Sequence, residues 1–296
     1  MDRVRNAIKN SRDSKRNNRI SIVTILLFFI LVGIEIMFLS HVLNAKIDNA
    51  VEVFAPFKMA NQSALENSIY ALQDIKNDTV PKAELIESHS IDKNRPVIAL
   101  TFDDGPHPQN TINILQTLSK YHAKATFFMV GENVERNQGI PQKVIDQGSE
   151  IGTHTWDHKN LTKLSETDIL DEITRGSKVI EENCGASVKF LRPPYGSNNE
   201  LVRNIAKQQN KAVILWNVDT EDWKSRDAEM VYRHVIENVK DGDIVLMHDI
   251  YGSTAEATEK IVKELTEKGY QFVTISELFQ VKGKPLNYGE KYYNCQ

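Results

Sequence analysis

Cysteine is nearly absent from this 296-residue sequence, which holds Cys184, Cys295 and no others. Neither residue has the neighbours expected of a metal site or of a nucleophilic thiol, so the sequence excludes chemistry that depends on cysteine. A disulfide between the two is permitted outside the cell without being required. A buried thiol and a thiol in the C-terminal tail are an equally good interpretation.

A net positive charge is found in the first 19 residues, and the rest of the chain is acidic overall. The first 19 residues carry seven basic and two acidic residues, a net charge of +5, and the whole-chain charge of −4 therefore leaves −9 for residues 20–296. Nucleic-acid phosphates are bound by basic surfaces, so an acidic body argues against a nucleic-acid partner. Nothing in the sequence identifies a protein partner.

One long apolar run follows the basic segment. Residues 20–43 are apolar apart from Glu35, His41 and a few hydroxyls, and roughly 20 such residues cross the hydrocarbon core of a bilayer. Glu35 lies well past the middle of the run, where it can reach the membrane interface. A cleaved signal peptide is the alternative, but the run is long for one and residues 43–45 make a poor cleavage site. We therefore expect an uncleaved transmembrane signal-anchor.

The basic residues before this anchor set its orientation, because such residues stay in the cytoplasm. We expect residues 1–19 in the cytoplasm and everything from residue 44 outside the cell, with one crossing of the cell membrane. Residues 44–92 mix helix-compatible runs with turn residues and carry no recognisable chemistry. They are interpreted as an extracellular stalk or linker.

From residue 96 onward, short apolar runs alternate with amphipathic stretches. The runs typical of strands are residues 97–102, 124–130, 149–154, 188–193, 211–218, 243–248 and 271–275. The stretches typical of helices are residues 110–121, 166–182, 199–208, 228–239 and 254–268. This alternation predicts parallel βαβ units whose strands are buried on both faces. An α/β fold of the distorted (β/α)7-type barrel fits these units better than an open sheet. We place this catalytic domain at residues 93–281 and a C-terminal tail at residues 282–296.

Polar clusters follow five of the predicted strands. Because the carboxyl ends of the strands in an α/β barrel form the rim where catalysis is assembled, these clusters are expected to meet. They are Asp103-Asp104, His154 with His158, residues 192–196, residues 219–223 and His248-Asp249.

Asp103 and Asp104 are adjacent carboxylates, and like charges that close resist joint ionisation. A divalent cation removes the conflict, because one carboxylate binds the metal while the other is free to act as a base. His154 and His158 have the four-residue spacing of metal ligands. Alone, the first motif is usually a surface turn and the second a solvated helix face. Together on one rim they favour a zinc-like ion with open positions for water and substrate.

These motifs resemble those of a known family. TFDDGP (101–106), HTWDH (154–158), RPPYG (192–196), DTEDW (219–223) and LMHD (246–249) are similar, in this order, to the five motifs of the NodB-type polysaccharide deacetylases, carbohydrate esterase family 4. The resemblance covers about residues 95–280. Within the family, the chain is most like the membrane-anchored peptidoglycan N-acetylglucosamine deacetylases.

The resemblance implies a metal site and a base. Asp104, His154 and His158 would be the metal ligands and Asp103 the general base. The chemistry agrees, because a divalent ion lowers the pKa of water that it binds, and a nearby carboxylate can then complete the deprotonation. Thr155 is expected to hold the histidine loop by a side-chain hydrogen bond.

The resemblance also implies partners for the base and an acid. Arg192 would pair with Asp103 and keep it ionised and aimed, and the backbone N–H of Tyr195 would stabilise the oxyanion. His248 would protonate the departing amine, with Asp222 raising its pKa. Without the resemblance, residues 192–196 are a rigid turn and His248 is a structural histidine.

Three residues are assigned to substrate binding by the same resemblance. Tyr195, Trp223 and Leu246 would line a small apolar pocket for the acetyl methyl group and the sugar face. Ordinary core packing remains an equally good interpretation of Leu246.

Together these inferences predict a hydrolase that acts on carbon–nitrogen bonds other than peptide bonds. It would remove N-acetyl groups from N-acetylglucosamine residues of a cell-wall polysaccharide, release acetate and depend on a divalent metal. Zinc is the expected ion, and the ligand set leaves cobalt, nickel and iron open. An external domain on a membrane anchor favours peptidoglycan as the substrate. Chitin oligomers, an N-acetylglucosamine exopolysaccharide and acetyl-xylan are alternatives with the same chemistry, and a non-catalytic glycan-binding module is the alternative of a different class.

Overall fold

The computed structural model describes residues 91–296. The predicted cytoplasmic segment, the predicted anchor at residues 20–43 and nearly all of the predicted stalk therefore lie outside the described residues. Within residues 91–296, no helix is both long enough and apolar enough to cross a bilayer.

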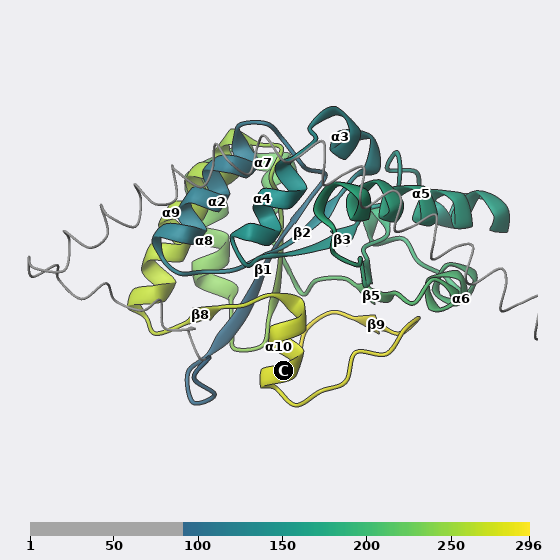
Figure 1. The fold of residues 1–296 in the computed structure, drawn as a ribbon. Helices are drawn as coiled ribbons and strands as arrows, with labels where there is room; N and C mark the ends of the chain where they lie inside the picture. The colour runs from purple at the N-terminus through teal and green to yellow at the C-terminus, as the bar shows by residue number, and fades with distance from the viewer. Residues whose placement is uncertain (1–90) are drawn as a thin grey trace, which may run out of the picture. The chain divides into compact units, whose positions relative to one another are not determined.

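A parallel sheet forms the centre of the described fold (Figure 1). Its strands follow one another in space in the order β6, β7, β1, β2, β3, β4, β5, β9, and β8 pairs with the first residues of β1. Every strand pair is parallel. The bounds are β1 (Val97–Asp103), β2 (Thr126–Met129), β3 (Glu150–Thr153), β4 (Phe190–Leu191), β5 (Ala212–Ile214), β6 (Val218–Asp219), β7 (Ile244–His248), β8 (Gln271–Phe272) and β9 (Lys291–Tyr292).

The sheet is a parallel α/β half-barrel, which is consistent with the predicted distorted (β/α)7-type barrel, and each predicted run contains a strand. One run differs from its prediction, because residues 211–218 divide into β5 and β6. The carbonyls of Ile214 and Leu215 at this break accept hydrogen bonds from the Arg192 side chain. The backbone then continues toward β7, where the N–H of Asn217 donates to the carbonyl of Ile244.

The five predicted helices are present as α2 (Asn110–Lys120), α5 (Glu166–Cys184), α6 (Glu200–Gln208), α8 (Ala228–Asn238) and α9 (Gly252–Glu267). Four short helices were not predicted, since seven residues or fewer give too little apolar periodicity to detect. They are α3 (Gly131–Arg136), α4 (Ile140–Asp146), α7 (Asp222–Ser225) and α10 (Ile275–Val281). Helices α2, α8 and α9 lie on one side of β1, and α10 lies on the other (Figure 1).

The period of two in β1 divides the core. Ile98, Leu100 and Phe102 pack in the cluster under α2, α8 and α9, whereas Val97 and Ala99 join the cluster under α10. By the same alternation, Thr101 and Asp103 share the face of Val97 and Ala99. A third apolar cluster packs α5 and α6 against β4 and β5.

The C-terminal segment is part of the barrel and not a detached tail. Strand β9 pairs with β5, and the N–H of Cys295 donates to the carbonyl of Gly242 just before β7. Tyr292 packs edge-on against Phe279 of α10, with ring centroids 4.9 Å apart. Cys184 and Cys295 are both buried and both free, and they lie in different apolar clusters. The disulfide alternative is therefore wrong in this structure.

Candidate active site

The carboxyl ends of the central strands bring the predicted polar residues to one rim. Strands β1 and β7 run side by side, and their register pairs Asp103 directly with His248. His154 follows β3, Arg192 follows β4 and Asp222 follows β6. These side chains line or adjoin a pocket of about 420 Å³, which is in the range of small-ligand sites. The pocket is lined by Asp103, Asp104, His154, His158, Tyr195, Trp216, Asp219, Trp223, Leu246, His248 and Tyr251.

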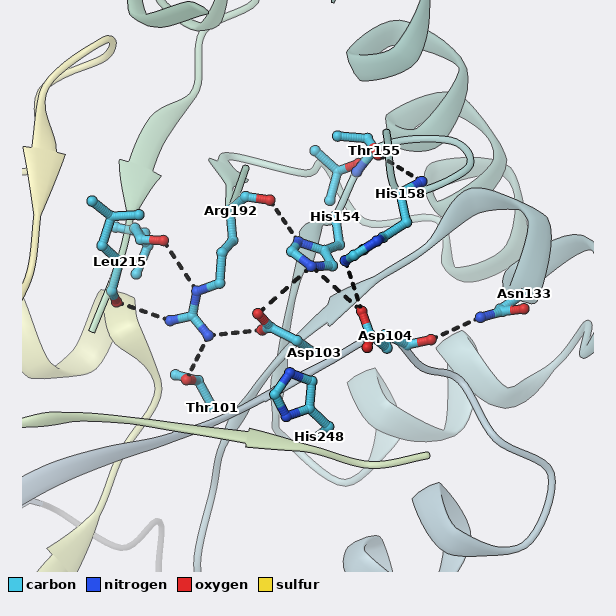
Figure 2. Close-up of polar contacts among 12 residues, drawn as sticks. Thr101, Asp103, Asp104, Asn133, His154, Thr155, His158, Arg192, Leu215 and His248 are labelled. Carbon is cyan, nitrogen blue, oxygen red and sulfur yellow. Dashed lines mark hydrogen bonds and ion pairs between the residues drawn. The ribbon is translucent and has the colours of Figure 1, made fainter. Parts of the chain in front are cut away.

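Asp104, His154 and His158 converge as a candidate metal site (Figure 2). Asp104 Oδ1 lies 3.5 Å from His154 Nε2 and 3.3 Å from His158 Nε2. This oxygen is buried and accepts no hydrogen bond from residues 91–296. An unsatisfied buried carboxylate oxygen is costly, and a cation held between it and the two ring nitrogens would remove that cost. The three side chains therefore fit a divalent metal with carboxylate and imidazole ligands.

His154 is prepared to act as a ligand. Its Nδ1 lies 2.6 Å from the carbonyl oxygen of Arg192, so Nδ1–H donates there and leaves the Nε2 lone pair free toward Asp104. Burial lowers the pKa of His154 to about 3, although the Asp104 charge opposes this. The ring is consequently neutral at physiological pH, as metal binding requires.

Arg192 is fully buried and anchors Asp103 (Figure 2). Its Nη1 donates to Asp103 Oδ1 and to Thr101 Oγ1, both at 2.7 Å, which places both acceptors on the inner face of β1. Its plane stacks on the Phe128 ring at 4.0 Å. Burial raises the pKa of the Asp103 carboxyl, and the Arg192 charge opposes that rise without cancelling it. The predicted pairing of Arg192 with Asp103 is therefore present. A carboxylate with a raised pKa is also a better proton acceptor.

Asp222 is the partner of His248. Its Oδ1 lies 2.8 Å from His248 Nδ1, and its Oδ2 accepts the His248 backbone N–H and the Thr254 hydroxyl. Burial lowers the pKa of His248, but the hydrogen bond and charge of Asp222 outweigh it and raise the value to about 9. The sequence-based expectation of a raised pKa is confirmed. Because Nδ1–H is held by Asp222, Nε2 is the nitrogen that can deliver a proton.

The histidine loop is held from two sides. The backbone N–H of His158 donates to Thr155 Oγ1 at 3.1 Å, which confirms the predicted hydrogen bond. The buried carboxylate of Glu172 in α5 accepts the N–H groups of Trp156 and Asp157 and the ammonium of Lys159. Glu172 lies among the charged residues of an amphipathic helix, and no local pattern distinguishes it from its exposed neighbours.

The predicted substrate-binding residues line the pocket. Tyr195 and Trp223 are large aromatic side chains left 67% and 49% exposed, and the Tyr195 ring packs edge-on against His158. Tyr195 has a positive φ of 62°, and its N–H has no acceptor within residues 91–296. Leu246 lines the pocket and is buried, so it takes part in the core as well.

Four further residues lie at the site without a role assigned to them from the sequence, although Asp219 and Asp249 belong to the predicted polar clusters. Trp216, Asp219 and Tyr251 line the pocket. Asp249, the residue after His248, is buried beside Gly105, where an added Cβ would meet its carboxylate at 2.3 Å. Burial raises the pKa of Asp249 to about 7, opposed by a hydrogen bond from Thr111. Asp219 and Asp249 directly follow predicted strands, which was the available signal for those two, whereas Trp216 lies inside a predicted strand and gave none.

Comparison with known proteins matches residues 90–214 to a family model described as polysaccharide deacetylase. The chain is 38% identical to the peptidoglycan-N-acetylglucosamine deacetylase PgdA of Listeria monocytogenes over 237 residues, covering 80% of this chain and 48% of PgdA. It is 40% identical to a peptidoglycan-N-acetylglucosamine deacetylase of Bacillus cereus over 197 residues, covering 65% of this chain and 92% of the relative.

A third similar protein has a solved structure. The peptidoglycan deacetylase PdaC of Bacillus subtilis superposes with a TM-score of 0.63 at 42% identity, covering 65% of this chain and 94% of the solved chain. PdaC is described as a peptidoglycan-N-acetylmuramic acid deacetylase, and the match covers 43% of its full length. The chain thus spans about half the length of the curated PgdA and PdaC. With the fold, the five motifs and these similarities in agreement, the chain belongs to the polysaccharide deacetylase family.

Proposed function

We propose that this protein is a metal-dependent N-deacetylase that hydrolyses the acetamide of N-acetylglucosamine residues in peptidoglycan and releases acetate. One observation carries the proposal. Asp104 presents a buried oxygen without a hydrogen-bond donor to two ring nitrogens, while Asp103 and His248 stand beside this site on adjacent strands. A metal site, a base and an acid on one rim are the parts that amide hydrolysis needs.

The proposed ligands are Asp104, His154 and His158, with zinc as the expected ion. When bound there, a divalent ion supplies Lewis acidity toward the acetamide carbonyl and toward water. A carboxylate with two neutral imidazoles suits zinc, and cobalt, nickel or iron(II) would also be accepted by these ligands. The low pKa of His154 supports this assignment, because the ring does not need to lose a proton on binding.

The proposed base is Asp103. The guanidinium of Arg192 fixes its Oδ1 at 2.7 Å, which leaves Oδ2 free to accept the proton of the attacking water. Oδ2 lies 3.7 Å from His154 Nε2, so the base adjoins the proposed metal site. The Tyr195 N–H donates to the oxyanion that develops on the acetyl carbonyl.

The proposed acid is His248. Asp222 holds its Nδ1, and the pKa of about 9 keeps the ring protonated at neutral pH. His248 gives its Nε2 proton to the amine nitrogen as the carbon–nitrogen bond breaks. Tyr195, Trp223 and Leu246 contact the sugar face and the acetyl methyl group. The products are acetate and a free amine on the glycan.

Peptidoglycan is proposed as the substrate because it is the abundant N-acetylated polymer next to a domain tethered outside the membrane. Two relatives described as peptidoglycan-N-acetylglucosamine deacetylases support this choice. The tether and the location are proposed from the sequence alone: a single-pass anchor at residues 20–43, the N-terminus in the cytoplasm and the catalytic domain outside. A mature N-terminus near residue 45 would contradict the anchor. The new cationic amines would make the wall a poorer lysozyme substrate.

The test is acetate release by the purified full-length protein from an N-acetylglucosamine tetramer and from purified peptidoglycan. We expect release from both, loss of release after chelation, and recovery on adding back zinc or cobalt. Asp103→Asn is expected to lower kcat by about 10²- to 10⁴-fold, the usual contribution of a general base. Absence of acetate release with every metal would instead favour the glycan-binding module. Activity unchanged in Asp103→Asn would contradict the assigned base.

A further inference from the structure

Arg226 stands at the rim of the candidate active site with part of its hydrogen-bonding capacity unused. It ends α7, is exposed, and has a positive φ of 51°. Its guanidinium carbon lies 3.4 Å from the centroid of the Tyr251 ring, and its Nε donates to the carbonyl oxygen of Trp223 at 2.8 Å. Tyr251 and Trp223 both line the pocket. The side chain is therefore fixed beside the pocket by two of the pocket's own residues.

The two terminal nitrogens of Arg226 have no acceptor within residues 91–296. The neighbouring cation on the same helix differs, because Lys224 is paired with Glu221 at 3.1 Å. Arg192, the other arginine at this site, is buried and donates to four acceptors. Arg226 thus combines a fixed position with free N–H groups, and a planar guanidinium fork is the group that binds carboxylates in a bidentate manner.

The residues of the pocket show where an acidic group of the substrate can lie. The residues that line it include Asp103, Asp104, His154, His158 and His248, which are assigned to the metal and to proton transfer. The acetamido sugar therefore occupies the pocket, and an acidic group beside that sugar lies at its rim. Arg226 puts a positive charge outside that lining, beyond the Tyr251 ring. A polymer that carries carboxylates would be oriented with its neutral acetamido sugar in the pocket and its acidic group at Arg226.

We infer that Arg226, supported by Tyr251 and Trp223, forms a subsite for a carboxylate carried by the polymer next to the sugar being deacetylated. This inference rests on the proposed N-deacetylase function and narrows its substrate to acidic glycans, in preference to neutral ones such as chitin or xylan. In peptidoglycan the carboxylate has two sources: the lactyl group of a peptide-free muramic acid, or a carboxylate of the attached peptide. Both offer the same chemistry to the guanidinium.

The experiment measures kcat/KM for acetate release by the full-length protein on three substrates of matched sugar number. They are a neutral N-acetylglucosamine tetramer, a peptide-free peptidoglycan tetrasaccharide with lactyl carboxylates, and the same tetrasaccharide with its peptides. The readout is the ratio of kcat/KM on each acidic substrate to that on the neutral one. We expect Arg226→Gln to lower this ratio by about fivefold through KM, the size expected for a rim ion pair with good geometry. A fall with the lactyl substrate assigns that source, and a fall only with the peptide-bearing substrate assigns the peptide.

The matched control is Lys224→Gln, which removes one positive charge from the same short helix. It is expected to leave the ratio unchanged, because Lys224 already has a carboxylate partner. Arg226→Lys is expected to restore only part of the ratio, since it keeps the charge but loses the stacked fork. An equal loss on all three substrates in Arg226→Gln would overturn the inference and leave Arg226 as a support for Trp223. Acetate release from none of the substrates by the parent protein would reject the proposed function itself.

Discussion

Asp103 and His248 lie side by side at the ends of two neighbouring parallel strands, because the register of β1 and β7 pairs their Cα atoms. The predicted base and acid are therefore held by the backbone of the most buried part of the sheet, not by loops. Each also has its own buried partner from another strand end, Arg192 for Asp103 and Asp222 for His248. This arrangement fixes the positions of the two proton-transfer groups on neighbouring strands, and it leads to predictions for each pair.

Asp222→Asn is expected to move the alkaline limb of the pH–rate profile toward lower pH. His248 acts as an acid only while protonated, and its pKa of about 9 places that limb near pH 9 in the parent protein. Without the carboxylate, burial dominates and lowers the pKa, so the acid loses its proton at a lower pH. The measurement is kcat against pH between 5 and about 10. The control is Asp219→Asn, because Asp219 lines the pocket but has no hydrogen bond to His248. An alkaline limb that does not shift in Asp222→Asn would contradict the assignment of His248 as the acid.

Arg192→Lys is expected to destabilise the fold and also to lower kcat for deacetylation. The guanidinium satisfies the carbonyls of Ile214 and Leu215 while it also binds Asp103, and an ammonium cannot reach all three. Buried groups left without partners cost about 1–3 kcal/mol each, so we expect a loss of about 3 kcal/mol in the free energy of unfolding. Thermal unfolding measures it, as a fall in Tm of about 6–12 °C for a domain of this size. The control is Arg136→Lys at an exposed position, whose free energy of unfolding should stay within about 0.5 kcal/mol of the parent value. Equal stability of the two variants would count against the anchoring role of Arg192.

The polar rim could be predicted from the sequence because each cluster directly follows an apolar run long enough to mark a buried strand. Asp103, His154 and His248 were found in this way, and the fold then brought them together. The roles given to them came from the family resemblance. The run that forms β1 is nearly continuously apolar and is buried on both faces, so strand geometry, and not a sequence pattern, puts Asp103 and Thr101 on one face.

Other parts of the site depend on tertiary contacts that leave no local pattern. Glu172 lies 16 residues from Trp156 on a helix whose charged positions resemble a solvated face, and only the packing of α5 against the histidine loop buries it. Strand β9 has two residues, too few for any alternation, so the closing role of the C-terminal segment was not foreseen. Arg226 was missed for the same reason, since its stacking partner Tyr251 is 25 residues away along the chain.

Glu172→Gln is expected to weaken metal binding by about 10- to 100-fold. This is the usual effect of changing a residue that holds metal ligands in place without binding the metal itself. One carboxylate oxygen accepts two backbone N–H groups of the histidine loop and the other accepts Lys159. An amide replaces one acceptor with a donor, so one of these contacts is lost and the His158 side of the loop loosens. The measurement is a calorimetric metal titration of the metal-free protein, with kcat determined at saturating metal.

Recovery of kcat at saturating metal would identify Glu172 as a positioning residue and not a participant in the reaction. Glu182→Gln, an exposed position near the end of the same helix, is the control and should bind metal like the parent. Parent-like metal affinity in Glu172→Gln would show that the loop is held adequately without this carboxylate.

Gly176→Ala tests the same contact between α5 and the histidine loop through size instead of charge. A Cβ at Gly176 would lie 2.5 Å from the carbonyl oxygen of Thr155, which belongs to backbone and cannot swing away. Replacing a helical glycine by alanine ordinarily stabilises by about 1 kcal/mol, but overpacking costs about 1–3 kcal/mol and must here displace the loop that carries His158. We therefore expect a net loss of stability together with weaker metal binding. The control is Gly252→Ala at the first position of α9, where the nearest atom to an added Cβ is 3.9 Å away, so it adds a methyl group without the clash and should be neutral or slightly stabilising. A stabilised Gly176→Ala that binds metal like the parent would mean that α5 does not set the position of the histidine loop.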